Sequence, residues 1–225
     1  EPATRDPMHA FRAVETAAYC PRKLYYRRRS PDEETPDAVA ARRELAFAYP
    51  HLLRDDDALG EAPIEVTPTQ FRSRLGAAKA RIDAWDALVD PMERDAFLSG
   101  RDCHGTAHKL LDTTPPSASL VFAGAPPETG VWRPQSVRLM AAAKALSWER
   151  ETQVERVFAE YPAYGVVREV PVDARRAAAY REALRIADSI DGPPARTQNR
   201  AKCDPCEFQP ECGVRTRSLR SLIGD

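Results

Sequence analysis

Apolar residues recur at helical spacing over most of the chain, and this pattern predicts a series of amphipathic helices. The clearest helix is predicted over residues 67–89, where Thr67 suits the N-cap and Pro68 suits the first turn. Its apolar stripe consists of Phe71, Leu75, Ala78, Ile82, Trp85 and Val89. Other helices are predicted over residues 10–29 with a break at Pro21, 38–54 with a kink or end near Pro50, 134–150 with a continuation towards Glu160, and 173–190.

The middle of the chain has a different pattern, with short apolar runs separated by turn residues. It predicts strands around residues 95–99, 104–111 and 118–123, and β-branched residues predict another strand over residues 165–172. The order is helices, a β-meander, a helix, a strand and a helix. This order predicts an α/β or α+β fold with a central mixed sheet flanked by helices.

Composition narrows the class of protein. Of the 225 residues, 43% are hydrophobic and 30% are charged, which is typical of a soluble globular protein. No apolar stretch has the length of a membrane span, and the polar N-terminus lacks a signal-peptide pattern, so we expect a cytoplasmic protein without a membrane partner. The net charge of −1 gives no overall attraction to nucleic acid, so any such binding must depend on local basic patches.

The five cysteines are an odd number, which argues against a disulfide framework. Cys203, Cys206 and Cys212 have the spacing C-x2-C-x5-C, which is typical of zinc and iron–sulfur sites. Cys20, in the sequence YCPRK at a predicted helix end, is the best candidate for a fourth ligand. Cys103, within a predicted strand, is interpreted as a small buried residue. The pattern favours a [4Fe-4S] cluster over zinc, with reduced structural thiols as the remaining alternative.

Basic and aromatic residues are interleaved just after Cys20, and further arginines follow Cys212. If these cysteines share one site, both groups lie on the same side of the molecule and form a candidate nucleic-acid surface. The candidate residues are Lys23, Tyr25, Tyr26, Arg27, Arg28, Arg29, Arg215, Arg217 and Arg220. A solvated charged face is the alternative interpretation, and it is the preferred one for Arg42-Arg43 and Arg175-Arg176.

The segments YCPRKLYYRRR and CDPCEFQPEC resemble those of RecB-like nucleases that carry a four-cysteine [4Fe-4S] cluster. This archaeal and bacterial family includes the CRISPR-adaptation exonucleases of the Cas-four type. The resemblance implies a restriction-endonuclease-like, PD-(D/E)xK core, with the N- and C-terminal segments joined by the cluster. Residues 1–54 would then be an N-terminal helical segment, 55–94 a helical insertion, 95–195 the nuclease-like core and 196–225 the cysteine-containing tail.

The family's catalytic site combines a histidine, a Gly-x-x-Asp strand, a Glu-x-Lys strand and a Gln-x-x-x-Tyr helix. Here His51 matches the histidine, while His108 stands at the aspartate position of the sequence GTAH, and Asp112 is the nearest carboxylate. The Glu-x-Lys position falls on residues 120–122 and the Gln-x-x-x-Tyr position near residues 138–142, but neither motif is present. Because carboxylates hold Mg²⁺ or Mn²⁺ in the family, these departures imply a degenerate site.

The sequence is compatible with three functions. The preferred hypothesis is a nucleic-acid-binding iron–sulfur protein without nuclease activity, with DNA favoured over RNA. An active metal-dependent DNA exonuclease of the CRISPR-adaptation or repair type, using His51, His108 and Asp112 with Mg²⁺ or Mn²⁺, is the first alternative. A protein–protein adaptor within a larger nucleoprotein complex is the second.

Overall fold

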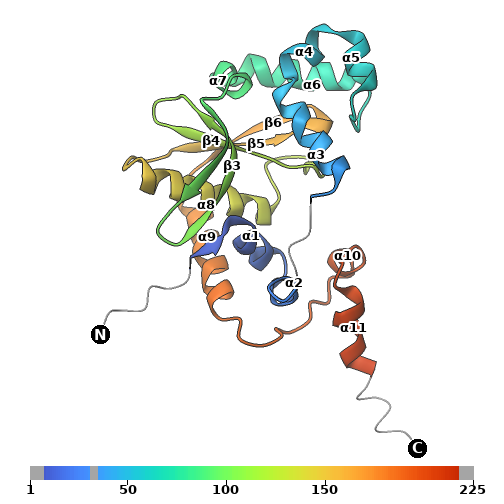
Figure 1. Cartoon of the computed structure of the whole chain (residues 1–225), viewed down its shortest axis with the longest axis vertical. Helices are drawn as coiled ribbons and strands as arrows, with labels where there is room; N and C mark the ends of the chain where they lie inside the picture. The colour runs from blue at the N-terminus through green and yellow to red at the C-terminus, as the bar shows by residue number, and fades with distance from the viewer. Residues whose placement is uncertain (1–7, 31–34, 218–225) are drawn as a thin grey trace, which may run out of the picture.

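A central mixed sheet of six strands organises the fold (Figure 1). The computed structural model of the chain describes residues 8–30 and 35–217. Its strands are β1 (His9–Ala10), β2 (Glu93–Ser99), β3 (Cys103–Leu111), β4 (Ser117–Val121), β5 (Arg156–Tyr161) and β6 (Val166–Pro171). The order is β1-β3-β4-β5-β6, and β2 pairs with β3. The β1–β3 and β4–β5 pairs are parallel and the others antiparallel, which confirms the predicted mixed sheet.

Strand β3 has an interruption along one of its edges. Strand β2 pairs with it from residue 104 to residue 110, which occupies one edge. On the other edge, β1 pairs with residues 103–104 and β4 pairs with residues 109–111. Residues 105–108 therefore have no strand partner on that edge among the described residues.

One face of the sheet is covered by α1 (Phe11–Tyr19), α8 (Arg133–Glu149) and α9 (Ala174–Asp188). Leu120 and Ala159 of the sheet pack into this layer, together with the alanine-rich side of α8. Helix α8 begins with Pro134 in its first turn, a position where the missing backbone N–H costs no hydrogen bond.

The other face is covered by shorter helices in the upper part of Figure 1. They are α4 (Tyr49–Arg54), α5 (Asp56–Glu61), α6 (Pro68–Arg81) and α7 (Trp85–Val89), and they follow α3 (Asp37–Glu44), which has no buried residue. Val121 and Phe158 point from the sheet into this layer, because neighbouring residues of a strand face opposite sides. Residues 45–53 share one hydrophobic cluster with residues 58–89, whereas α1 belongs to the layer on the first face.

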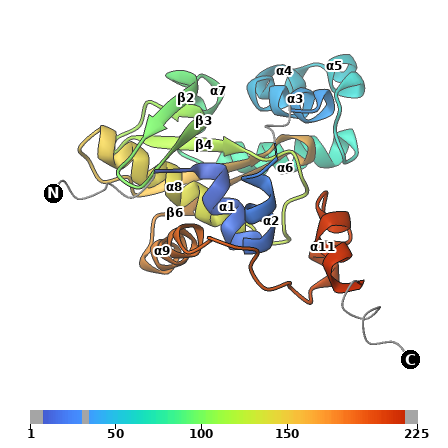
Figure 2. The same ribbon diagram turned by 60° about the horizontal axis from the view of Figure 1, so that its bottom comes forward.

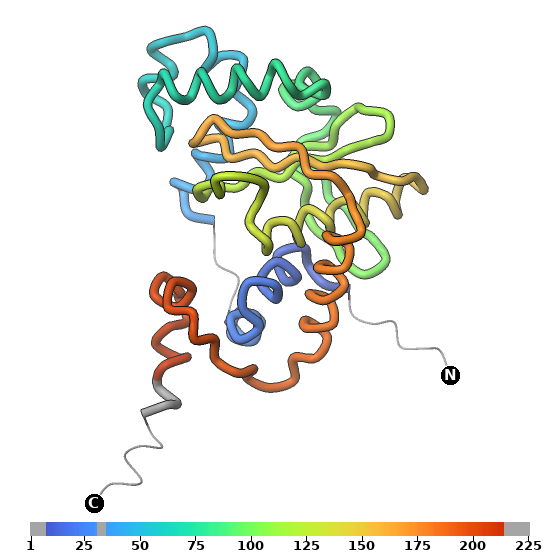
Figure 3. Tube along the Cα trace, turned by 180° about the vertical axis from the view of Figure 1, so that it is seen from behind, coloured from blue at the N-terminus to red at the C-terminus, as the bar shows by residue number. Residues whose placement is uncertain are grey.

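The two ends of the described chain lie side by side. Helix α2 (Pro21–Arg27) follows α1, and α10 (Arg200–Cys203) and α11 (Gln209–Arg217) follow the long loop after α9. Figures 2 and 3 show the C-terminal helices beside α2. None of the described helices combines the length and the apolarity that crossing a membrane requires.

Several element boundaries differ from the sequence predictions. The helix predicted over residues 67–89 is interrupted after Arg81, and α7 starts at Trp85. Pro50 lies in the first turn of α4, so it starts a helix rather than ending one. The predicted continuation of α8 to Glu160 is wrong, because Glu160 belongs to β5. Strand β1 and helices α10 and α11 were not predicted.

Candidate functional site

The four cysteines expected to act as ligands line one cavity. Cys20 lies between α1 and α2 with extended backbone angles, and Pro21 then starts α2. Cys203 ends α10, Cys206 follows in the connecting turn, and Cys212 lies on α11. Within residues 8–30 and 35–217, no three His, Cys, Asp or Glu side chains are arranged as a metal site. The thiols thus share a cavity without forming a complete ligand geometry.

Polar contacts fasten the N-terminal side of this cavity to the C-terminal side. The Lys202 Nζ donates to the Tyr19 carbonyl oxygen at 2.8 Å, and Tyr19 Oη donates to the Lys202 carbonyl oxygen at 3.3 Å. The ring of Tyr26 stacks on Phe208 with 5.8 Å between the centroids. These contacts span more than 180 positions of the chain, so they close nearly all of it into one loop.

Cationic side chains beside the cysteines favour negative charge on their sulfur atoms. Burial opposes the charged form of Arg22, but Cys212 and Tyr26 beside it raise the pKa of its guanidinium overall. Lys202 lies 5.0 Å from the centre of the Tyr19 ring, and both residues line the cysteine cavity. Four thiolates, or a cluster that they hold, would lie beside four cationic side chains of this cavity, namely Arg22, Lys23, Arg196 and Lys202.

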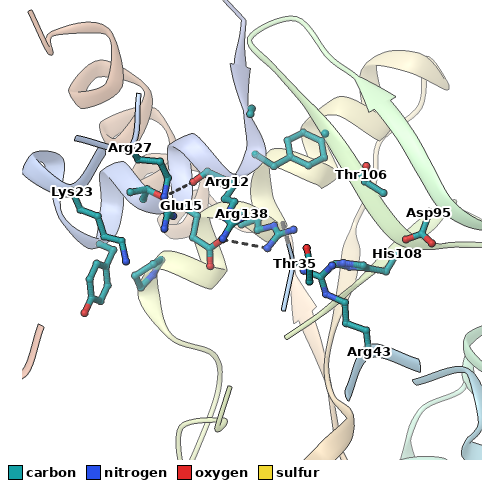
Figure 4. Close-up of a pocket in the computed structure, with 16 residues that line it drawn as sticks. Arg12, Glu15, Lys23, Arg27, Thr35, Arg43, Asp95, Thr106, His108 and Arg138 are labelled. Atoms are coloured by element: carbon teal, nitrogen blue, oxygen red, sulfur yellow. Dashed lines mark hydrogen bonds and ion pairs between the residues drawn. The ribbon is translucent and has the colours of Figure 1, made fainter. Parts of the chain in front are cut away.

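A second and larger cavity, of about 750 Å³, lies against the interrupted edge of β3 (Figure 4). Gly105, Thr106 and His108 form its floor, and α1, α2, α3 and α8 contribute to its walls. Its cationic side chains are Arg12, Lys23, Arg27, Arg43 and Arg138. Its only carboxylates among the described residues are Glu15 and Asp95. The cavity therefore carries an excess of positive charge.

The cations of this larger cavity are only partly neutralised. Arg138 donates to Glu15 Oε2 at 3.4 Å. Outside the cavity, Glu207 pairs with Lys23 at 2.7 Å and with Arg27 at 2.5 Å.

The remaining cations have no such compensation. Among the described residues, no ion pair involves Arg12 or Arg43. The Nε atoms of Arg43 and Arg138 are buried without a hydrogen-bond partner. Burial, together with the nearby Arg138 and Arg12, lowers the pKa of Arg43 even though Asp95 favours its charged form.

His108 faces this cationic group from the floor and is only 5% exposed. Burial, followed by repulsion from Arg138, Arg43 and Lys109, lowers its pKa to about 3, so the ring is neutral near pH 7. Its Nδ1 accepts a hydrogen bond from the backbone N–H of Val121 at 2.9 Å. The ring proton must then be on Nε2, which makes His108 a neutral donor.

Two backbone features shape the floor around His108. Gly105 adopts a φ of 155°, and a Cβ there would meet the ring of Phe11 at 2.6 Å. Only glycine thus lets α1 approach β3 this closely. Asp95 of β2 stands opposite His108 of β3, but the two residues are not paired in the strand register. Asp95 has a φ of 51°, and its side chain lines the cavity.

The three residues expected to be catalytic are not brought together. His51 is exposed on α4 and Asp112 is exposed just after β3, and neither lines the larger cavity. Only His108 lines that cavity.

Cys103, which was expected to be a small buried residue, is 1% exposed, and Tyr180 donates a hydrogen bond to its Sγ at 3.0 Å.

The residues expected to contact nucleic acid are divided among several environments. Lys23 and Arg27 line the larger cavity, whereas Tyr26 packs on Phe208. Arg28 donates to the Ala187 carbonyl oxygen, and the Arg29 guanidinium lies 3.6 Å from the centre of the Tyr25 ring. Arg215 and Arg217 are on α11, but their side chains and the whole of Arg220 lie outside the described residues.

Sequence reasoning missed most of the cationic cavity. Arg43 was assigned to a solvated helix face, and this is wrong because Arg43 lines the cavity. Arg12, Arg138 and Asp95 were not singled out. Their chain positions are far apart, and only the packing of α1, α3 and α8 around β3 brings them together. Arg138 falls within the expected Gln-x-x-x-Tyr position, and this match was a sequence feature that could have pointed to Arg138.

A second polar group missed from sequence is buried on the opposite face of β3. Lys109 is completely buried and donates to Glu160 Oε2 at 2.9 Å and to the carbonyl oxygens of Ala46 and Leu88. Ser119 donates to the second Glu160 oxygen at 2.5 Å. All three ammonium protons of Lys109 have acceptors, so this group is structural.

No protein-family model and no curated protein sequence matches this chain. Among solved structures, it is similar to the one described as "Crystal structure of SSO0001", with a TM-score of 0.38 and 10% sequence identity. That similarity covers 89% of this chain and 94% of the other. Function therefore has to be argued from the site itself.

Proposed function

We propose that this protein binds nucleic acid through its cationic cavity without cleaving it, and that a [4Fe-4S] cluster fastens the two ends of the chain beside that cavity. The excess of cations over carboxylates in the cavity carries the proposal. Phosphate groups of a nucleic acid supply the missing negative charge, and arginine can bind them through two parallel hydrogen bonds.

The same cavity is poorly suited to a divalent metal. Mg²⁺ and Mn²⁺ are bound mainly by oxygen ligands, and catalytic sites usually supply carboxylates. Glu15 is paired with Arg138, while Asp95 stands within the field of Arg43. A divalent cation would be repelled by the arginines that surround these two groups. This chemistry supports binding without hydrolysis.

The cysteine cavity suits an iron–sulfur cluster by its donors and its surroundings. Four thiols are the usual ligands of a [4Fe-4S] cluster, and such a cluster carries net negative charge that Arg22 and Lys202 would offset. Zinc is the alternative occupant, because thiolates suit both metals. In either case Cys20, Cys203, Cys206 and Cys212 would hold it, and its contribution would be to join α2 to α10 and α11.

Binding and cleavage are separated by one assay on protein prepared without oxygen. Labelled single-stranded DNA, duplex DNA and single-stranded RNA are incubated with Mn²⁺, Mg²⁺ or EDTA and analysed on native and denaturing gels. We expect retarded bands of intact strands in all three conditions. Shortened strands that disappear with EDTA would contradict the proposal and favour the exonuclease. Absence of binding, with stable co-purification of a partner protein, would favour the adaptor.

The occupant of the cysteine cavity is identified by metal analysis and the visible spectrum of the same preparation. About four irons per chain and a brown colour are expected for a [4Fe-4S] cluster. One zinc per chain in a colourless protein would keep the joining role but exclude the iron–sulfur cluster.

A further inference from the structure

The inner end of the cationic cavity is formed by Arg43, Arg138 and His108, which we call the inner group. All three side chains line the cavity, and Arg12 adds a further charge at its more exposed rim. From this arrangement we propose that the inner group binds one terminal phosphate group, and does so without a divalent metal. This inference rests on the proposed function, and it specifies which part of a nucleic acid enters the cavity.

The first support is the incomplete compensation of the two positive charges of Arg43 and Arg138. Burying like charges next to one another is unfavourable unless an anion accompanies them. Arg43 has no ion-pair partner among residues 8–30 and 35–217, and Arg138 pairs there only with Glu15, at 3.4 Å. An anion that enters the cavity would therefore supply the missing negative charge.

The second support is the neutral donor at the floor. His108 is held by the Val121 N–H so that its Nε2–H remains free to donate. A neutral donor between two cations avoids a third positive charge, yet it completes the hydrogen bonding of a tetrahedral anion. The donor set thus combines two forked cations with one neutral N–H.

The depth of the inner group favours an end group over the middle of a strand. His108 is 5% exposed and the Arg138 side chain is 16% exposed, so a phosphate must leave bulk solvent to reach them. A terminal phosphate can enter such a recess by itself, whereas an internal phosphate brings a nucleoside on both sides.

The matched variants are provided by two adjacent arginines of α3. Arg43 belongs to the inner group, while Arg42 pairs with Glu65 and does not line the cavity. Arg43→Gln removes an inner cation, and Arg42→Gln removes the same charge from the surface. Because Arg43 is half-buried beside Arg138 and Arg12, we expect Arg43→Gln to be as stable as wild type or more stable. A purely structural Arg43 would instead lose stability on this change.

The experiment measures the affinity of single-stranded oligonucleotides in EDTA by fluorescence anisotropy. One sequence is used with a phosphate at the 5′ end, at the 3′ end, or at neither end. We expect one phosphorylated form to bind at least tenfold more tightly than the unphosphorylated strand. Arg43→Gln should abolish that difference, and Arg42→Gln should preserve it.

Inorganic phosphate provides the second arm, measured as a rise in the melting temperature of the protein. Equal affinity for all three oligonucleotides would overturn the inference while leaving the proposed function intact. Stabilisation by inorganic phosphate that requires Arg43, without binding of any oligonucleotide, would support the phosphate site and overturn nucleic-acid binding. A phosphate preference that appears only with Mg²⁺ would contradict the metal-independent site.

Discussion

His108 shows how its surroundings decide the role of a single residue. Burial and the nearby Arg138 and Arg43 keep its imidazole neutral. Its hydrogen bond with Val121 fixes the ring and its tautomer. The residue therefore serves the cavity as an oriented donor.

The pKa of His108 makes the stability of the protein depend on pH. The pKa is about 3 in the folded state and about 6.5 in an unfolded chain, so the unfolded state binds more protons between these values. Stability is then complete above about pH 6.5 and decreases as the pH falls towards 3. The slope attributable to this residue is at most about 1.4 kcal/mol per pH unit.

The measurement is urea unfolding of wild type and His108→Asn between pH 4 and pH 8. Asparagine offers an acceptor to the Val121 N–H but does not titrate, so the variant should lose stability less steeply on acidification. Carboxylates titrate equally in both proteins and cancel in the comparison. Identical slopes would show that His108 titrates in the folded protein as it does in the unfolded one.

Glu207 connects the C-terminal stretch that contains Cys203, Cys206 and Cys212 to the cationic cavity through ion pairs. It follows Cys206 directly and pairs with Lys23 and Arg27, which line the cavity. Burial opposes its ionised form, but hydrogen bonding from Lys23 lowers its pKa overall, so it remains a carboxylate near neutral pH. In the proposed complex it would compete with phosphate groups for these two cations.

Glu207→Gln is therefore expected to strengthen binding of single-stranded DNA by about threefold to tenfold, the range expected for two exposed charge contacts. Fluorescence anisotropy at low salt measures this change, with Glu211→Gln as a control on the neighbouring helix. Weaker binding in Glu207→Gln would mean that the carboxylate positions the cations rather than competing for them.

At the level of single residues, the sequence pointed to the cysteines that line one cavity but not to most residues of the other cavity. Cys203, Cys206 and Cys212 were recognisable because C-x2-C-x5-C is a local spacing, and the structure places Cys20 in the same cavity. The cationic cavity has no local pattern. Arg43 looks like any surface arginine beside Arg42 until the helix is docked on the sheet.

Most of the elements themselves were predictable. The β-meander and α9 follow their apolar periodicity closely, as do the two helices around Pro21. Strand β5 was missed because no glycine or proline precedes it. The turn after α8 uses Glu151 with a φ of 49°, a conformation that usually signals glycine. Without that signal, the polar run after α8 looked like more helix.

The buried pair of Lys109 and Glu160 ties elements together across the sheet. Lys109 is on β3, Ser119 on β4 and Glu160 on β5, and the ammonium also reaches the carbonyl oxygens of Ala46 and Leu88 in the helical layer. Breaking one partner of such a pair leaves an uncompensated buried charge, which costs more than the pair itself contributes.

Lys109→Met is thus expected to lower the free energy of unfolding by about 3–5 kcal/mol. Guanidinium unfolding monitored by circular dichroism measures the loss. The double variant Lys109→Met/Glu160→Gln removes both charges and should recover part of it. A double variant that is as unstable as the sum of the two single variants would show that the charges do not act as a pair.

In the whole molecule, contacts beside the cysteine cavity fasten together the two ends of the described chain. The proposed cluster would add a link from Cys20 to Cys203 that restricts a loop of nearly the full length, and its loss would free the C-terminal helices. Cys20→Ser should lower the iron content and expose residues 195–217 to limited trypsin digestion, followed by mass spectrometry. Cys103→Ala, which alters a buried cysteine outside the cavity, should retain iron. Equal protease resistance of Cys20→Ser and wild type would contradict the joining role.

The central claim, nucleic-acid binding through the cationic cavity, is tested most directly by the salt dependence of binding to single-stranded DNA in EDTA. Each phosphate neutralised contributes about −0.7 to the slope of log K against log [KCl]. If Arg12, Arg43 and Arg138 each bind a phosphate, we expect a slope of about −2 or steeper. The slope should become shallower in Arg43→Gln. Undetectable binding at low salt, or binding that does not change with KCl, would contradict it.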